Sequence, residues 1–529
     1  MRRTIVLKAI LLTLSGAFYP GSSAAARSPA PIPPGAGDSQ ITQISARLSS
    51  GKTSCVSVIE ARLDRIRRLD GSLHAVTAIS PIALDEAQRI DALPRRARRA
   101  LPLACVPLLV KDNIDVAGMV TTSGSVALAG NVASDNAWVV ARLKRAGAIV
   151  VAKTNMSEFA FNYRGRSSIR GQTTSPFAFS ESAGGSSSGN AAALAAGFGA
   201  IALGTDTSGS ARVPAALSGL VGLRPTFGAL PMGGVLPLSP SQDVIGPMCT
   251  HVADCAAVWS VLTSTHDTPA GRPLKNLRVG VLSAFMRPDA KAETQALERL
   301  RAAGATVADI HLRDETVLVG KNAPIGETAT FASRSVFDFP GVMDAYLPWR
   351  AGVPHDAGAL LAELRHQAAN GNTDPRVVED VAKFITNRAG AARDPRFRVN
   401  GMFRDRYVAD RLDEAFDCTS GRACVDVIVY PSVQVPFATA DAGPETAGTH
   451  RLAAYSGRPA IAIPIGAVLT TGGLRPVSLE LLGRRGDDRR LLAIAAAWQA
   501  RLALPRIIPC ESAKALVCLT DPAPNARRH

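Results

Sequence analysis

Short apolar runs alternate with helical segments along much of this sequence, and this alternation is the feature that most constrains its fold. The apolar runs have the length of buried strands and lie at 106–110, 148–152, 201–203, 277–282 and 427–430. Segments with apolar residues at helical spacing lie among them, at 54–69, 137–146 and 190–200. Short buried strands that alternate with helices are typical of sheets covered by helices. The sequence therefore predicts an α/β fold.

Between residues 310 and 400 the sequence becomes polar and helical and has no strong strand pattern. Aromatic residues concentrate in this stretch, at Phe331, Phe337, Phe339, Tyr346 and Trp349. We predict a helical insert here. Two interpretations stay open: an insert that helps to roof a pocket, and a helical layer that uses its aromatic side chains as core.

The N-terminus has the order of a secretory signal. An apolar stretch at 9–18 is followed by small residues at 22–26 and preceded by three basic residues, Arg2, Arg3 and Lys8. This is the arrangement of a cleaved signal peptide, and the apolar stretch is too short to cross a bilayer. We therefore predict export to the periplasm or the medium, without stable membrane anchoring. The Sec and twin-arginine routes both stay open.

These features divide the chain into four segments. We predict a signal peptide over 1–26, a Pro-rich leader over 27–40, one folded domain over 41–505 and a C-terminal tail over 506–529.

The chain has eight cysteines. Two pairs bracket short segments and are disulfide candidates in an oxidising compartment, Cys418 with Cys424 and Cys510 with Cys518. Cys249 and Cys255 form a weaker pair, because one is expected at a strand end and the other inside a helix. Cys55 and Cys105 lie in apolar segments and are expected to be plain buried thiols. No C-x-x-C or H-x-x-x-H pattern occurs, so we expect no metal site.

The net charge of +15 raises the question of an acidic partner. The basic residues are scattered, and no basic stripe interleaved with aromatic residues occurs among them. We therefore predict a solvated basic surface and no nucleic-acid partner.

Two turns rich in glycine and serine, 184–189 and 204–210, each adjoin a predicted strand or helix. Small residues let the backbone approach a ligand, present successive N–H groups to an anion, and leave serine hydroxyls unshielded. The first turn also satisfies G-x-S-x-G, which would make Ser187 the nucleophile of an α/β-hydrolase, with His450 as a candidate base. A phosphate loop is excluded, because Ser50-Gly-Lys-Thr53 lacks the upstream glycine.

Three segments together resemble the amidase signature family. They are Cys105-Val-Pro-Leu-Leu-Val-Lys111-Asp112, Ala183-Gly-Gly-Ser186-Ser-Ser-Gly189 and Gly204-Thr-Asp-Thr-Ser-Gly-Ser210-Ala-Arg212-Val-Pro214. Supporting stretches include Lys153-Thr-Asn155, Gly222-Leu-Arg-Pro225 and Gly246-Pro-Met248. The order and gaps match the family, and the likeness covers most of residues 40–505.

The resemblance implies a single α/β/α domain around a mixed sheet and a Ser–cis-Ser–Lys triad. Ser210 would be the nucleophile, Ser186 the proton relay on a cis peptide bond, and Lys111 the base. A lysine serves as a base only when neutral, and burial among apolar strand residues lowers its pKa.

The resemblance also implies roles for the residues around Ser210. The backbone N–H groups of Thr207, Ser208 and Gly209, with that of Ser210 itself, would form the oxyanion hole. Asp206 and Arg212 would hold the loop in shape. The family commonly has glycine where this chain has Ser188 and Ser208, and the effect of these two side chains on the acyl site is open.

The predicted function is that of an exported amidase, which hydrolyses an amide to acid plus ammonia or amine without a cofactor. The substrate is predicted to be a small aryl or aliphatic primary amide, and Phe159 is the candidate residue for its pocket. Three alternatives stay open: a C-terminal peptide amidase, a catalytically idle amide-binding protein, and the α/β-hydrolase that uses Ser187. The export signal argues against the glutamyl-tRNA amidotransferase subunit, and the oligomeric state is open.

Overall fold

The computed structural model describes residues 39–265, 274–287, 290–319, 333–419, 424–444 and 446–502, with short pieces at 324–325, 329–330, 504, 506–509, 512 and 514–520. The signal peptide and most of the leader predicted from the sequence lie outside these residues. Among the described residues, no helix is both long and apolar enough to cross a membrane.

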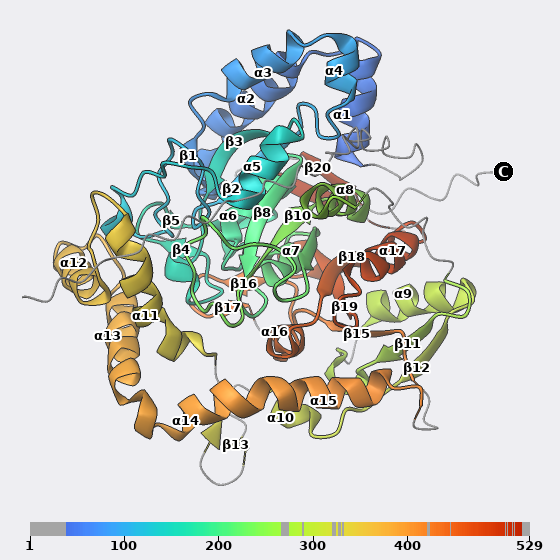
Figure 1. Cartoon of the computed structure of the whole chain (residues 1–529). Helices are drawn as coiled ribbons and strands as arrows, with labels where there is room; N and C mark the ends of the chain where they lie inside the picture. Colours follow the sequence, from blue (N-terminus) through green and yellow to red (C-terminus); the bar gives the residue numbers. More distant parts are fainter. Residues whose placement is uncertain are drawn as a thin grey trace, which may run out of the picture.

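An eleven-stranded sheet forms the centre of the molecule (Figure 1). Its strands, in order across the sheet, are β1 (Val76–Ile79), β3 (Ile149–Thr154), β2 (Pro107–Lys111), β8 (Ile201–Asp206), β10 (Val244–Cys249), β9 (Val221–Arg224), β18 (Ala460–Thr470), β19 (Gly473–Leu482), β15 (Val427–Pro431), β11 (Arg278–Val281) and β12 (Thr306–Asp309). Strand β2 is parallel to β3 and β8, whereas β10 is antiparallel to both of its neighbours. The predicted α/β class and mixed sheet are therefore confirmed.

The five apolar runs predicted as strands are β2, β3, β8, β11 and β15. Every residue of β2, β3 and β8 is buried, as expected for strands that are covered on both faces. Their near-continuous apolar sequence follows from this position.

Helices cover the sheet. They are α1 (Gln40–Ser49), α2 (Cys55–Leu73), α3 (Ala83–Asp91), α4 (Arg95–Arg99), α5 (Trp138–Arg145), α6 (Ser188–Ala195), α7 (Arg212–Leu217), α8 (Val252–Thr263), α9 (Lys291–Ala302), α16 (Arg451–Ser456) and α17 (Asp488–Gln499). The predicted helix 190–200 ends earlier than expected. Gly197 adopts a positive φ of 75° and its N–H donates to the carbonyl of Leu194, which is a common way to end a helix.

The residues between β12 and β15 are mostly helical, as the predicted insert requires. They form α10 (Glu315–Val319), α11 (Ser335–Tyr346), α12 (Ala357–Ala369), α13 (Pro375–Gly390), α14 (Pro395–Arg398) and α15 (Arg404–Phe416). These helices run along one side of the molecule, at the left and bottom of Figure 1. The helical stretch extends past the predicted boundary at residue 400.

The aromatic residues of the insert do not all have the same role. Phe339 is buried and packs edge-on against Phe159 and Phe161 of the central domain, and Phe384 of α13 joins this cluster. Trp349, in contrast, is 86% exposed. Aromatic packing thus joins the insert to the rest of the fold.

Part of the predicted C-terminal tail is structured. Strands β20 (Arg506–Pro509) and β21 (Val517–Thr520) pair antiparallel. The N–H groups of Leu516 and Val517 donate to the carbonyl of Pro176 at 2.9 and 3.1 Å. The chain therefore returns to the central domain beyond residue 505, a long-range contact that local sequence pattern does not reveal.

The structure brings six cysteines together in pairs. The sulfur atoms lie 2.08 Å apart in Cys418–Cys424, 2.22 Å in Cys249–Cys255 and 2.16 Å in Cys55–Cys105. The last pair differs from the expectation of separate buried thiols, because the first residue of α2 packs against the segment that leads into β2. Cys510 lies outside the described residues, and so does the side chain of Cys518.

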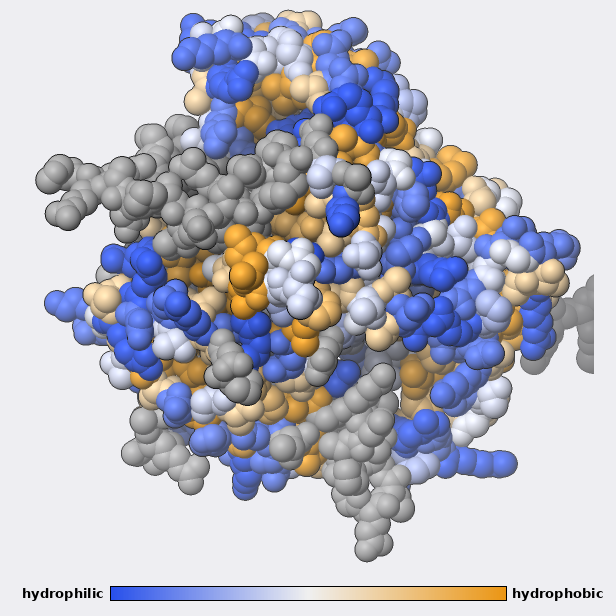
Figure 2. Space-filling view, turned by 180° about the vertical axis from the view of Figure 1, so that it is seen from behind, coloured by the Kyte–Doolittle hydropathy of each residue, from blue (hydrophilic) through white to orange (hydrophobic). Residues whose placement is uncertain are grey.

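Hydrophilic and apolar residues are mixed on the surface (Figure 2). Figure 2 shows hydrophilic residues spread over one face of the molecule among small apolar areas, without a single continuous band.

Candidate active site

Lys111 and the two Gly/Ser-rich turns meet at one edge of the sheet. Lys111 is the last residue of β2, and Ser210 follows the end of the parallel neighbour β8. The carboxyl ends of parallel strands share one edge of a sheet, where ligand sites commonly form. Ser186 reaches the same edge from the turn that leads into α6.

Hydrogen bonds join Lys111 to both turns and the two turns to each other. The Lys111 Nζ atom donates to Ser186 Oγ and to Thr205 Oγ1, both at 2.8 Å. The Gly185–Ser186 peptide bond is cis, and the N–H of Ser187 donates to the carbonyl of Ser210 at 3.0 Å. Lys111, Ser186 and Ser210 are all buried. The structure thus brings together the three residues that the sequence singled out.

Burial changes the acid–base behaviour of Lys111. Removal from water disfavours the ammonium form and lowers the pKa of Lys111 to about 7, although the carboxylates of Asp206 and Asp243 partly oppose this effect. A lysine with such a pKa is largely neutral in mildly alkaline solution and can accept a proton there.

Asp206 organises the loop between β8 and α7. Its Oδ1 atom accepts the N–H of Gly209 at 2.7 Å, and its carboxylate pairs with Arg212 at 3.0 Å and with Arg224 at 3.1 Å. Burial alone would raise the pKa of Asp206, but the two guanidinium groups outweigh it and hold that pKa well below its usual value. Arg212 is also paired with the buried Glu480. The loop therefore rests on a buried charge network.

The backbone N–H groups of this loop differ in their partners. The N–H of Gly209 donates to Asp206 Oδ1 at 2.7 Å, and its predicted part in an oxyanion hole stays a prediction. Within the described part of the chain, the N–H groups of Thr207, Ser208 and Ser210 have no acceptor. These three amides are available as hydrogen-bond donors.

Three further residues hold the loop from outside, and their roles were not predicted from the sequence. Asp243 accepts the hydroxyl of Thr207 at 2.6 Å, and Gln242 Nε2 donates to the Thr207 carbonyl at 3.3 Å. The hydroxyl of Tyr163 donates to the carbonyl of Ser208 at 3.0 Å. None of the three lies in a recognisable motif, so only their position in the fold reveals them.

The structure also places the two serines that depart from the family pattern. Ser188 begins α6 and is fully buried, and its hydroxyl donates to Thr173 Oγ1 at 3.2 Å. Ser208 is partly exposed and lies two residues before Ser210.

Phe159, the candidate for the substrate pocket, is buried in the aromatic cluster that contacts the insert. Its ring packs against Phe161 and Phe339, with centroids 5.4 and 5.5 Å away.

The alternative nucleophile Ser187 has a different environment. Its hydroxyl donates to the backbone carbonyl of Thr205 at 3.4 Å. The ring of His450 is fully buried against Tyr163, and neither of its nitrogens has a hydrogen-bond partner among the described residues. No Ser–His pair of the α/β-hydrolase type forms in the part of the chain that the structure describes.

Comparison with known proteins agrees with this geometry. The Amidase family model matches residues 57–492. One subunit of the glutamyl-tRNA(Gln) amidotransferase of Symbiobacterium thermophilum is 33% identical over 480 residues, which cover 85% of this chain and 94% of that protein.

Solved structures of peptide amidases are also similar. The native peptide amidase of Stenotrophomonas maltophilia has a TM-score of 0.75 and 30% identity, with 90% of this chain and 99% of that chain covered. A peptide amidase in complex with the competitive inhibitor chymostatin has a TM-score of 0.74 and 31% identity, with 88% and 98% covered. The chain belongs to the amidase signature family and is an enzyme that acts on amide C–N bonds.

Proposed function

We propose that this protein hydrolyses a carboxylic amide through an acyl-enzyme on Ser210, with Ser186 as proton relay and Lys111 as base. The observation that carries the proposal is the 2.8 Å hydrogen bond between Lys111 Nζ and Ser186 Oγ, made by a buried lysine with a lowered pKa. A serine hydroxyl is a weak nucleophile unless a base accepts its proton.

The reaction proceeds in two halves. Neutral Lys111 accepts the proton of Ser186, which accepts that of Ser210, and Ser210 Oγ forms a bond to the amide carbonyl carbon. The tetrahedral intermediate collapses when the C–N bond breaks, and the proton returns from Lys111 through Ser186 to the leaving nitrogen. Water then attacks the ester by the same proton route and releases the carboxylic acid.

The oxyanion of the tetrahedral intermediate needs hydrogen-bond donors. We assign this role to the N–H groups of Thr207, Ser208 and Ser210, which have no acceptor among the described residues. Donors that are already in place stabilise developing charge strongly, because they do not reorganise during the reaction.

The proposed substrate is a small aryl or aliphatic primary amide. A C-terminal peptide amide is the second candidate, supported by the 30–31% identity and near full-length overlap with peptide amidases. The curated relatives are named as subunits of an amidotransferase, so copurification with a partner protein is a separate check. The secretory pattern of the N-terminus favours a stand-alone exported enzyme.

Ammonia release from acetamide, phenylacetamide and a dipeptide amide tests the activity and ranks these substrate classes. Lys111→Ala and Ser210→Ala should each lower the rate by about 10²–10⁴-fold or more, with losses that do not add in the double variant. Lys383→Ala, which removes an exposed lysine from α13, is the matched control and should retain full activity.

A fluorophosphonate probe should label Ser210 in the wild type but not in Ser210→Ala. Near-wild-type turnover of a folded Lys111→Ala variant would overturn the proposed base. Loss of labelling in Ser187→Ala but not in Ser210→Ala would restore the α/β-hydrolase alternative.

Export is part of the proposal and has its own test. We expect cleavage near Ala25 or Ala26, so the intact mass of the periplasmic or secreted protein should lack the preceding residues. A mature chain that still begins at Met1 would exclude a cleaved signal.

A further inference from the structure

The nucleophile loop, residues 207–211 between β8 and α7, carries three N–H groups without an acceptor among the described residues, those of Thr207, Ser208 and Ser210. A peptide unit is planar, so its C=O and its N–H point in opposite directions. A hydrogen bond to the carbonyl of one residue therefore also sets the direction of the N–H of the next residue. The three carbonyls that precede these N–H groups consequently decide where the donors point.

Two of these carbonyls are held by groups that already shape the loop. The Gly209 carbonyl accepts the N–H of Val213 at 2.8 Å, in the first turn of α7. The Asp206 carbonyl accepts a hydrogen bond from Nη1 of Arg224, whose guanidinium also pairs with the Asp206 carboxylate. The start of α7 and the buried charge network thus set the directions of two of the three donors.

The third carbonyl is that of Thr207, and a side chain from another segment holds it. Nε2 of the buried Gln242, in the loop that precedes β10, donates to this carbonyl at 3.3 Å. The N–H of Ser208 lies in the same peptide unit. No other group among the described residues donates to the Thr207 carbonyl. The direction of the Ser208 N–H therefore depends on one amide group from outside the nucleophile loop.

The other end of this amide is fixed by the insert. Gln242 Oε1 accepts the backbone N–H of Arg334, just before α11, and Nη2 of the buried Arg404, at the start of α15, each at 3.0 Å. Two donors meet at the oxygen, so the nitrogen is the end of the amide that faces Thr207. A glutamine meets both requirements, because it is an acceptor toward the insert and a donor toward the loop.

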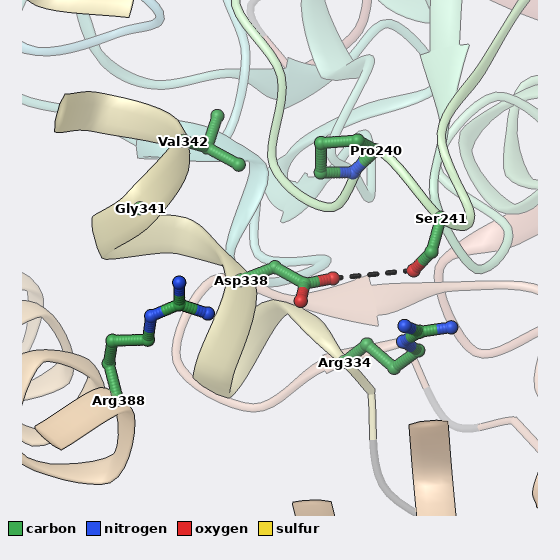
Figure 3. Close-up of a pocket in the computed structure, with 7 residues that line it drawn as sticks. All are labelled: Pro240, Ser241, Arg334, Asp338, Gly341, Val342 and Arg388. Carbon is green, nitrogen blue, oxygen red and sulfur yellow. Dashed lines mark hydrogen bonds between the residues drawn. The ribbon is translucent and has the colours of Figure 1, made fainter. Parts of the chain in front are cut away.

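The residues next to Gln242 attach the same segment firmly. The hydroxyl of Ser239 donates to the carboxylate of Asp338, on α11, at 2.7 Å. Figure 3 shows the hydroxyl of Ser241 directed at the same carboxylate, 3.3 Å away. The backbone carbonyl of Gln242 accepts Nη2 of Arg224 at 2.9 Å. The segment that carries Gln242 is therefore held between the insert and the buried charge network.

We propose that Gln242 is a positioning residue for the oxyanion hole. Its amide holds the Thr207 carbonyl so that the N–H of Ser208 faces the oxyanion, and the insert in turn holds the amide. The inference rests on the proposed function and adds a route by which the insert affects the rate of the reaction. An interaction that stabilises only the tetrahedral intermediate acts on kcat and leaves KM unchanged.

Two substitutions of Gln242 test this role. Gln242→Glu keeps acceptor oxygens for the two arginines but cannot donate to the Thr207 carbonyl, and Gln242→Met removes donor and acceptor without adding a charge. With the best amide among acetamide, phenylacetamide and a dipeptide amide, each variant should lower kcat and kcat/KM by the same factor, about 10²-fold. Rates are compared on the alkaline plateau of the pH profile, where a change in the pKa of Lys111 has no effect.

The matched controls are Gln295→Glu and Gln295→Met, because Gln295 is exposed on α9. Both should keep the kcat and KM of the wild type.

A second readout needs no amide substrate. When a fluorophosphonate reacts, Ser210 Oγ displaces fluoride from phosphorus, and the phosphoryl oxygen takes the place of the oxyanion. The second-order rate constant of labelling should fall about 10²-fold in both Gln242 variants. The extent of labelling at completion should match that of the wild type. This extent counts folded sites, so it separates a loss of folded protein from a misplaced donor.

The outcomes separate the two proposals. Wild-type kcat and labelling rate in both Gln242 variants, or a rise in KM with kcat unchanged, overturn the positioning role and leave the amidase proposal standing. Absence of hydrolysis by the wild type, with a labelling rate that depends on Gln242, overturns the amidase proposal and supports the positioning role. Absence of both hydrolysis and labelling of Ser210 in the wild type overturns both.

Discussion

The chemistry of Lys111 depends on the balance between its burial and two nearby carboxylates. Burial lowers its pKa to about 7, while Asp206 and Asp243 raise it. Asp206 also accepts hydrogen bonds from the nucleophile loop, so its removal would disturb several contacts at once. Asp243 is the better probe of the electrostatic effect, because Thr207 is the residue of the nucleophile loop that its carboxylate contacts. Its other hydrogen bonds, from the N–H groups of Leu238 and Ser239, lie outside that loop.

The pH dependence of the rate should report this balance. Protonated Lys111 cannot accept a proton, so kcat/KM should fall about tenfold per pH unit below pH 7. Asp243→Asn removes a negative charge that stabilises the ammonium form of Lys111. In this variant the fall of kcat/KM on the acid side of the pH profile should therefore move to lower pH. Profiles of kcat/KM from pH 5 to 9 check this, and an acid limb that moves to higher pH would contradict the assignment.

At the scale of elements, Glu158 joins the central domain to the insert. Its carboxylate accepts the N–H and hydroxyl of Ser168 at 3.0 and 2.9 Å, and the hydroxyl of Thr373, just before α13, at 3.2 Å. Burial raises the pKa of Glu158 to about 7, above its ordinary value of 4.5, although these hydrogen bonds oppose the effect. The folded state therefore holds a proton that the unfolded state releases in this range.

The stability of the protein should consequently depend on pH through Glu158. Between pH 4.5 and 7 the unfolded chain binds fewer protons at this position, so the free energy of unfolding falls as the pH rises. As the pH rises through this range, the free energy of unfolding of the wild type should fall by about 3 kcal/mol more than that of Glu158→Gln. Urea unfolding of both proteins at pH 5 and pH 8 measures the difference.

The control for this prediction is Glu379→Gln, an exposed carboxylate on α13. Its unfolding free energy should stay parallel to that of the wild type between the two pH values. If the free energy of unfolding of Glu158→Gln changes with pH as much as that of the wild type does, Glu158 is ionised in the folded protein throughout this range.

At the scale of the whole molecule, the cysteine pairs connect segments of very different separation. Cys55 and Cys105 are 50 residues apart, whereas Cys418 and Cys424 are six apart. A cross-link restricts the unfolded chain more strongly when it closes a longer loop. An oxidising compartment, as export would provide, is the condition under which such bonds persist.

Removal of these bonds should destabilise the oxidised protein unequally. The chain-entropy argument gives about 4 kcal/mol for the 50-residue loop and about 2 kcal/mol for the six-residue loop. Urea unfolding of Cys55→Ala/Cys105→Ala and Cys418→Ala/Cys424→Ala, each compared with the wild type, measures this. Peptide mapping without reductant establishes the bonds themselves, and it also covers Cys510 and Cys518. Free thiols at all of these positions would exclude them.

The sequence by itself determined the class of the fold and the position of its chemistry. The apolar runs that form β2, β3 and β8 are buried on both faces. A strand in such a position needs apolar residues at nearly every position, and this continuous run is visible in the sequence. The motifs around Lys111, Ser186 and Ser210 are equally local, because small residues and serines must stand next to one another in the chain to form these turns. Their grouping into one triad followed from the resemblance to the amidase signature family, and the structure places them at one edge of the sheet.

The tertiary structure alone decided which distant residues complete the site. Thr205 contacts Lys111, Asp243 contacts Thr207, and Glu480 pairs with Arg212, yet none of these contacts leaves a periodic pattern or motif. The N–H of Gly209 donates to Asp206 because the loop folds back on that carboxylate, which no local spacing reveals. The pairing of Cys55 with Cys105 has the same origin. The contacts made by Thr205, Asp243 and Glu480 depend on how segments far apart in the chain pack against one another, and this packing has no local signature in the sequence.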